Sequence, residues 1–220
     1  MGRIFLQFFY FYRNFAIFNF QFAFYNSGLS GLGSRQQTGR IMYQDVMIAG
    51  FGGQGVLLAG KLLAYAGMLE GKRVTWFPSY GAEIRGGTAN CTVIISDEEV
   101  GSPVVQNPSA MLIFNEASFK KFEKRIKPGG RLFLNTSLVH EPPTRDDIAR
   151  IEVKANDIAE TIGDIRIANM VMLGAFLKKT GVVSLESVLA ALKQVLPARR
   201  HNLLPLNESA LIRGGEESQR

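Results

Sequence analysis

Short apolar runs alternate with amphipathic stretches along most of this chain. Strand-length runs are predicted at residues 46–49, 73–77, 91–95, 111–114, 132–134 and 150–154, the last as a candidate edge strand. Apolar side chains at helical spacing predict helices at 56–69, 117–126, 155–159, 167–179 and 185–196, and a short helix from Asn207. Such alternation is typical of an α/β fold. We expect a three-layer Rossmann-like domain with a mostly parallel sheet and helices on both faces.

A glycine loop joins the first predicted strand to the first helix, and it contains Gly50, Gly52, Gly53, Gln54 and Gly55. Three of these glycines have the G-x-G-x-x-G spacing, in the strand–turn–helix context that the motif requires. Glycine lets backbone approach a ligand, and a helix start offers unpaired N–H groups that suit a phosphate. All five residues are therefore candidates for cofactor binding. The alternative is a close turn without a ligand.

The second predicted strand argues against a classical nicotinamide site. Such a site needs an acidic residue at the end of that strand, where the carboxylate binds the ribose hydroxyls. Residues 73–77 are followed by Pro78, with no Asp or Glu.

A second glycine-bearing segment, residues 78–90, contains Glu83, Arg85, Gly86 and Gly87. Arginine can form a bidentate contact with a carboxylate or a phosphate, so these four residues are further candidates for cofactor binding. The alternative is a solvated Glu83–Arg85 ion pair on an ordinary loop. Asn169 is a polar residue in an apolar helix. It is either a hydrogen-bonded core amide, which we favour, or a contact to a ligand or partner.

Composition and charge exclude several classes of function. The single cysteine, Cys91, lies in an apolar run, where we expect a buried core residue; it provides neither a disulfide framework nor a cluster ligand set, which is consistent with a reducing cytoplasm. Residues 1–41 carry four arginines and no acid, so they account for +4 of the net charge of +6. The rest of the chain therefore gives no support for nucleic-acid binding.

The first 41 residues differ from the rest. Residues 5–25 hold 12 of the 23 aromatic residues, without a clean period, and polar side chains interrupt them, so the stretch is a poor membrane span. We expect residues 1–41 to be an extension and linker that is disordered or results from an upstream start assignment, residues 42–214 to be the folded domain, and residues 215–220 to be a polar tail. The rival interpretation is a membrane-associating anchor.

Four segments together resemble the gamma subunit of 2-oxoacid:ferredoxin oxidoreductases, with the 2-oxoglutarate type as the closest match. They are GFGGQGV at 50–56, SYGAEIRGGTANCTV at 79–93, KPGG at 127–130 and RIANMV at 166–171. The resemblance covers about residues 44–214, and the long second segment is its most specific part. Ala82 departs from the family, which has proline there.

This resemblance implies a non-autonomous part of an enzyme. The complex would decarboxylate a 2-oxoacid on thiamine diphosphate and Mg, pass electrons through iron–sulfur clusters to ferredoxin, and form an acyl-CoA. The chain alone would bind none of these cofactors, which would belong to alpha and beta subunits, with a delta subunit as a further candidate. Coenzyme A would be a substrate, and its phosphate is the candidate ligand of the glycine loop.

Two other functions stay open from the sequence. One is a family member that acts on pyruvate, a branched-chain oxoacid or indolepyruvate. The other is a free-standing Rossmann-type nucleotide-binding module. We expect neither a nucleic acid nor a membrane among the partners.

Overall fold

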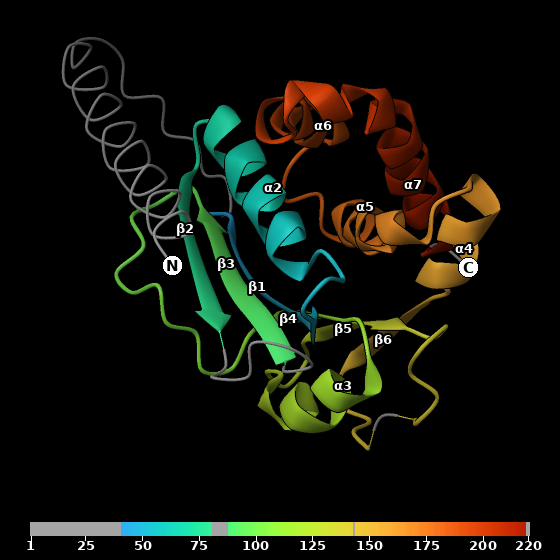
Figure 1. Cartoon of the computed structure of the whole chain (residues 1–220). Coiled ribbons are helices and arrows are strands. Elements are labelled where there is room, and N and C mark those ends of the chain that lie inside the picture. Colours follow the sequence, from blue (N-terminus) through green and yellow to red (C-terminus); the bar gives the residue numbers. More distant parts are fainter. Residues whose placement is uncertain (1–40, 81–87, 143, 219–220) are drawn as a thin grey trace, which may run out of the picture. The chain divides into compact units, whose positions relative to one another are not determined.

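The computed structural model describes residues 41–80, 88–142 and 144–218, which form a six-stranded sheet with helices on both faces (Figure 1). The strands are β1 (Tyr43–Phe51), β2 (Arg73–Tyr80), β3 (Thr88–Ser96), β4 (Ala110–Ile113), β5 (Arg131–Asn135) and β6 (Ala149–Val153). Their order across the sheet is β2-β3-β1-β4-β5-β6. The expected α/β class and the mostly parallel sheet are confirmed, and β6 is an edge strand.

One strand, β3, runs antiparallel to both of its neighbours, β1 and β2. Only seven residues join β2 to β3, whereas a parallel neighbour requires a crossover of a dozen or more. The two strands therefore form a hairpin, and β3 lies between β1 and β2. In a classical dinucleotide fold, the strand that carries the acidic residue lies directly beside the first strand.

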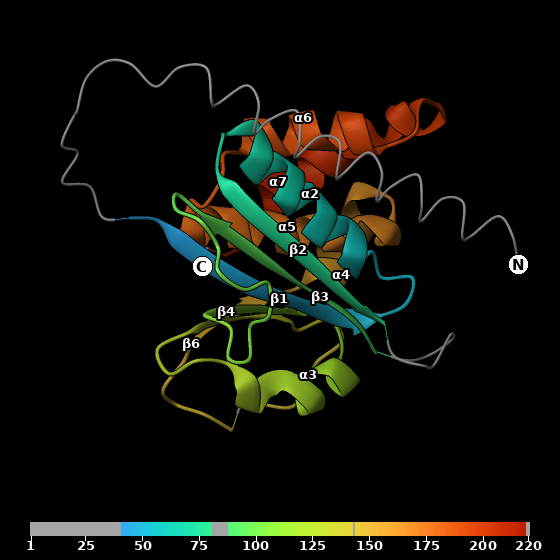
Figure 2. The same ribbon diagram turned by 90° about the vertical axis from the view of Figure 1, so that its left-hand side faces the viewer.

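The two faces of the sheet are covered unequally. Val46 and Ile48 of β1 contribute to a large buried cluster with helices α2 (Val56–Leu69), α4 (Ala155–Ile162), α5 (Ala168–Thr180), α6 (Leu185–Val195) and α7 (Leu204–Glu217). Met47 and Ala49, which alternate with them, contribute to a smaller cluster with α3 (Glu116–Phe122) and Ile126. Helix α3 accordingly lies on the opposite side of the sheet from α2, α5 and α6 (Figure 2).

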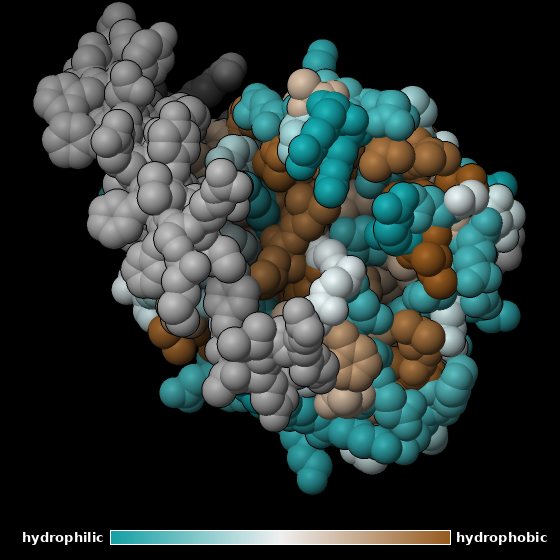
Figure 3. Space-filling model, viewed as in Figure 1, coloured by the Kyte–Doolittle hydropathy of each residue, from teal (hydrophilic) through white to brown (hydrophobic). Residues whose placement is uncertain are grey.

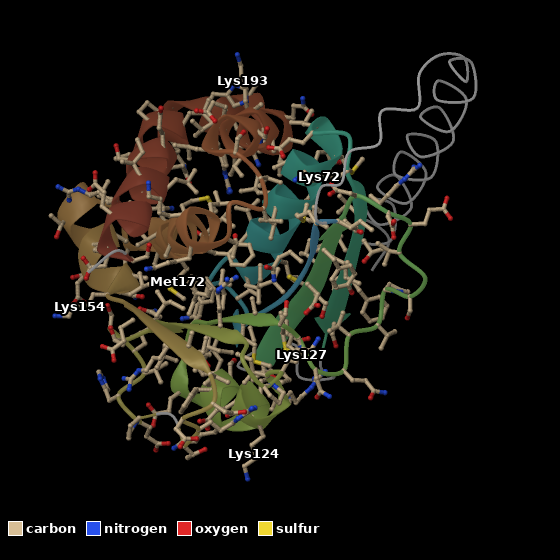
Figure 4. The ribbon with its side chains drawn as sticks, turned by 180° about the vertical axis from the view of Figure 1, so that it is seen from behind. Lys72, Lys124, Lys127, Lys154, Met172 and Lys193 are labelled. Carbon is tan, nitrogen blue, oxygen red and sulfur yellow. The ribbon has the colours of Figure 1, made fainter. Side chains whose placement is uncertain are left out.

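Helices α5 and α7 approach each other unusually closely. A Cβ atom added to Gly174 would lie 2.0 Å from the Leu211 carbonyl oxygen, and one added to Gly214 would lie 1.9 Å from that of Val171. Hydrogen in place of a side chain is what allows the two backbones to come this near. Met172, on the same helix as Gly174, is fully buried between sheet and helices, as the view from behind shows (Figure 4).

Most element bounds agree with the sequence pattern, and α2 agrees at both ends. The C-terminal end does not. In place of a short helix from Asn207 and a polar tail from residue 215, α7 begins at Leu204, with Pro205 in its first turn, and continues to Glu217. Gly214, Gly215 and Ser218 are buried, because this helix covers α5. Within the described residues, no helix is both long and apolar enough to cross a membrane.

Candidate functional site

The candidate site lies at the carboxyl ends of β1 and β4, where the chain changes from one face of the sheet to the other. Helix α2 follows β1 on the larger face, and α3 follows β4 on the opposite face. Ligands of open α/β sheets bind in the crevice at such a switch point. The glycine loop follows β1 and Asn115 follows β4, so both lie at this switch point.

Residues 51–54 of the glycine loop form a tight turn. The Gln54 N–H donates to the Phe51 carbonyl over 3.2 Å. Gly53 has φ +104°, the left-handed conformation that the third position of a type II turn demands. The Gln54 side chain folds back, and its Oε1 accepts a hydrogen bond from the Phe51 N–H at 2.7 Å. The turn is thus closed by backbone and side chain together.

The positions of this loop differ in whether, and why, the structure requires glycine. A Cβ on Gly50 would lie 2.7–2.9 Å from Gln54, Val56 and Phe114. Gly55 is left-handed, with φ +74°, and its Cβ would lie 2.2 Å from Asn169 Nδ2. Gly52 is exposed, and a Cβ there would meet nothing within 4 Å. No contact within the described part of the chain therefore requires glycine at position 52.

Two amide side chains hold the loop from different helices. Asn115 Nδ2 donates to Gln54 Oε1 at 2.8 Å, and Asn115 Oδ1 caps α3 by accepting from the Ser118 N–H, also at 2.8 Å. Asn169, in the first turn of α5, is 3% exposed, and its Nδ2 donates to the Gly55 carbonyl at 3.2 Å. The structure thus places Asn169 in the core and in contact with the glycine loop.

A third amide stands at the next strand end. Asn135 closes β5, where its Nδ2 donates to the Phe114 carbonyl and to Asn156 Oδ1, and its Oδ1 accepts from the Ala155 N–H at the start of α4. Neither Asn115 nor Asn135 was predicted from the sequence to be a site residue. A signal was present, because each asparagine directly follows or ends a buried strand, where an amide can cap the next helix. Their partners across the sheet follow only from the strand order.

The start of α2 presents positive potential that its own cap and first turn do not neutralise. Gly55 is its N-cap and provides no capping side chain, and the first turn contains no acidic residue. A 14-residue helix leaves its first N–H groups without intrahelical partners and carries a partial positive charge at this end. Lys61, which is half-buried in the second turn of α2, has a pKa lowered by burial. The start of α2 therefore suits an anionic group.

Exposed apolar side chains surround this edge. Phe51 ends β1, Leu138 follows β5, and Ile165 precedes α5; they are 38%, 38% and 48% exposed. On the face seen in Figure 3, apolar side chains gather near the centre and hydrophilic ones border them. Large exposed apolar groups next to a polar loop are typical of a surface that meets a ligand or another protein.

The second candidate segment is only partly described. Glu83, Arg85, Gly86 and Gly87 lie outside the described residues. The strands that flank them, β2 and β3, end and begin at the same sheet edge as the glycine loop, because Tyr80 pairs with Ala89 and Phe51 pairs with Thr88. Lys121 of α3 donates to Thr88 Oγ1 at 2.9 Å.

Cys91 is fully buried, as expected, and it lies beneath α2 rather than in the crevice. Burial raises the pKa of its thiol to about 12, although a hydrogen bond with Trp76 acts in the opposite direction. Among the described residues, no group of three or more His, Cys, Asp and Glu side chains is arranged to hold a metal ion.

Comparison with known proteins extends over the same domain. The family model described as pyruvate ferredoxin/flavodoxin oxidoreductase matches residues 45–217. The ketoisovalerate oxidoreductase subunit VorA of Methanothermobacter marburgensis is 41% identical over 141 residues, which make up 64% of this chain and 29% of VorA. The chain therefore spans only about a third of the length of that relative.

A shorter relative is matched over most of its length. The 2-oxoglutarate synthase subunit KorC of Methanothermobacter marburgensis is 37% identical over 163 residues, which are 71% of this chain and 88% of KorC. Among solved structures, the gamma subunit of keto/oxoacid ferredoxin oxidoreductase from Geobacter sulfurreducens has a TM-score of 0.70 and 31% identity, with 80% of this chain and 98% of that one covered. The chain belongs to the pyruvate ferredoxin/flavodoxin oxidoreductase family.

Proposed function

We propose that this chain is the gamma subunit of a 2-oxoacid:ferredoxin oxidoreductase that oxidatively decarboxylates its substrate, forms an acyl-CoA and reduces ferredoxin. The observation that carries the proposal is the family match over residues 45–217, together with matches that cover 88% of KorC and 98% of the Geobacter gamma subunit. Both of those relatives are subunits of about the size of this domain. The chain would therefore work beside alpha and beta subunits, with a delta subunit as a further candidate.

The proposed substrate is 2-oxoglutarate, which gives succinyl-CoA and CO2. The support is the KorC relative and the sequence segments that resemble the 2-oxoglutarate type. The VorA relative bears the name of a ketoisovalerate enzyme, so a branched-chain oxoacid is the competing substrate.

In this proposal the partner subunits hold thiamine diphosphate, Mg and the iron–sulfur clusters. The side chains of this subunit support that division, because its one cysteine is buried and protonated, whereas an iron–sulfur cluster needs several thiolates. In this proposal, the subunit contributes the sheet edge at which the glycine loop leads into α2.

The glycine loop is proposed to receive an anionic group of coenzyme A. Two observations support this role: the start of α2 has neither a capping side chain nor an acidic residue in its first turn, and Gly52 leaves open space that none of the described residues fills. Glu83, Arg85, Gly86, Gly87 and Asn169 are proposed to complete the site. The alternative is that the loop packs against a partner subunit.

The first experiment tests the class of enzyme. Gentle affinity purification of the tagged chain from its native cells is expected to recover stoichiometric partner subunits that carry thiamine diphosphate and iron–sulfur clusters. The complex is then assayed for CoA-dependent reduction of a viologen dye with 2-oxoglutarate, ketoisovalerate, pyruvate and indolepyruvate. A lone chain that binds NAD(P) would overturn the proposal and favour the free-standing nucleotide-binding module.

A second experiment tests the loop. Gly52→Leu introduces bulk where the chain itself offers room, and Gly101→Leu is the matched control, because Gly101 is also exposed and its Cβ would also meet nothing within 4 Å. A selective rise in the KM for coenzyme A with Gly52→Leu supports the ligand interpretation. An unchanged KM with weaker assembly supports packing against a partner.

A further inference from the structure

The orientation of two amide side chains in the crevice is fixed by backbone groups at both ends. The Phe51 N–H can only donate, so the Gln54 atom that it meets is the oxygen, and the Ser118 N–H fixes the Asn115 oxygen in the same way. The remaining Asn115 NH2 group then points at Gln54 Oε1, 2.8 Å away. We call this contact the Gln54–Asn115 tether. It has one polarity only, because a flipped amide would place a donor against a donor.

The tether joins the two sides of the switch-point crevice. Gln54 belongs to the loop that starts α2 on one face of the sheet, and Asn115 caps α3 on the other. Between the tether and β1 lie Gly52 and Gly53, which have no side chains and are exposed. Two consecutive glycines have many accessible conformations, so a bond at the end of the turn selects one of them.

From this geometry we infer that Asn115 is a positioning residue, which acts through Gln54 to hold the glycine loop in the conformation that receives coenzyme A. The inference rests on the proposed function. Asn115 itself is 3% exposed, and its side chain is used by Gln54 and Ser118. Its effect on the ligand therefore passes through the loop.

The chain permits substitutions that separate this role from helix capping. Asn115→Asp and Asn115→Ser both keep an oxygen that caps α3. Asp, however, turns the donor toward Gln54 into an acceptor, and Ser is too short to reach Gln54. Gln54 cannot compensate by flipping, because its NH2 group would then face the Phe51 N–H. Both variants lose the tether and keep the cap.

Two control variants accompany them: one removes a helix cap elsewhere in the chain, and the other changes Gln54 but keeps the tether. Ser184→Ala removes the cap of α6, where Ser184 Oγ accepts from the Ser187 N–H. The Ser184 N–H also donates to Glu70 Oε1, just beyond the C-terminal end of α2, so this substitution lies at the opposite end of that helix from the glycine loop. Lys72, labelled in Figure 4, marks the same far end. Gln54→Glu retains both acceptor bonds and hence the tether.

The experiment uses the assembled complex and measures two quantities. Hydrogen exchange, followed by mass spectrometry, reports on the peptide that spans residues 51–58, and steady-state assays give kcat and the KM for coenzyme A. In Asn115→Asp and Asn115→Ser we expect loop exchange and this KM each to rise about 3- to 10-fold, the factor that corresponds to one lost hydrogen bond, with kcat nearly unchanged. Ser184→Ala should change neither, and Gln54→Glu should leave loop exchange at the wild-type rate.

Any other result would contradict either the inference about Asn115 or the proposed function. Unchanged loop exchange in both Asn115 variants would overturn it, since the tether would not hold the loop. Faster exchange with an unchanged KM for coenzyme A would also overturn it, because the held conformation would then be irrelevant to the ligand. If the purified complex shows no CoA-dependent activity, the proposed function fails, whereas exchange in the full chain still tests the tether.

Discussion

At the crossing of α5 and α7, glycine is needed because another part of the chain lies where a side chain would be. In the loop between β1 and α2, the described residues leave open space around Gly52. Gly174 and Gly214 would place a Cβ about 2 Å from backbone oxygens, whereas Gly52 would meet nothing within 4 Å. The first region uses glycine for packing, whereas in the second the described residues leave the space beside Gly52 open. The same residue type therefore has consequences for stability in the first region, and for the proposed binding of coenzyme A in the second.

The largest effect is expected at the helix crossing. Gly214→Ala places a methyl group against the Val171 backbone, which cannot rotate away, so α5 and α7 must separate. We expect the free energy of unfolding to fall by about 3 kcal/mol or more, measured by urea denaturation. Gly215→Ala is the matched control, since its Cβ would lie 3.4 Å from Lys178 Cβ in ordinary contact. That variant should be neutral or gain up to about 1 kcal/mol from helix propensity; equal losses would contradict the packing explanation.

The central strands β1, β3, β4 and β5 were predictable because each contains a short buried run, and α2 because apolar residues recur at helical spacing with little interruption until Gly71. The reversed direction of β3 depends on the short connection between β2 and β3, which is too short for the crossover that a parallel pair needs. The extension of α7 was missed because Pro205 and Gly214 interrupt a helical pattern, while packing on α5 overrides both. In the site, the glycine loop was predicted, but the contacts of Asn115 and Asn169 join residues 61 and 114 positions apart, which no local pattern specifies.

An intermediate effect is expected where loop and core meet. Gly55→Ala combines a left-handed backbone with a clash against Asn169, so the domain should lose about 2–3 kcal/mol. Gly71→Ala has the same φ of +74° but nothing within 4 Å, so it should lose only about 1–2 kcal/mol. The difference between the two variants measures the contact with Asn169. It should shrink in an Asn169→Ala background, and an unchanged difference would show that Asn169 does not cause it.

Gly60 packs against Cys91, so the effect of substituting this glycine can be followed through the reactivity of the thiol. Its Cβ would lie 2.4 Å from Cys91 Sγ, so Gly60→Ala should cost about 1–3 kcal/mol and speed alkylation of the chain's single cysteine.

In the wild type, the raised pKa of Cys91, about 12, keeps the folded thiol protonated. The unfolded thiol ionises near 9.0, so this group favours the folded state below pH 9 and its contribution is lost as the pH rises toward 12. Fast labelling of the native protein at pH 8 would contradict the buried position.

The smallest effect on stability is expected at Gly52. Its φ is not among the positive values, and its Cβ would point into open space, so Gly52→Ala should change the free energy of unfolding by less than about 0.5 kcal/mol. Thermal denaturation of the isolated full chain provides the measurement. A loss comparable to that of Gly55→Ala would remove the contrast between the two glycine-dependent regions.

The close crossing of α5 and α7 also has a consequence for how the polypeptide is made. Helix α5 is buried nearly all round, and α7, the last helix described, is its principal neighbour. While the ribosome is still adding residues 204–217, the face of α5 that α7 covers is bare, and its apolar surface is exposed in the nascent chain. Domains of this kind complete folding late in synthesis and are prone to aggregate until then. A premature stop codon in this region should therefore yield an aggregating product that chaperones retain.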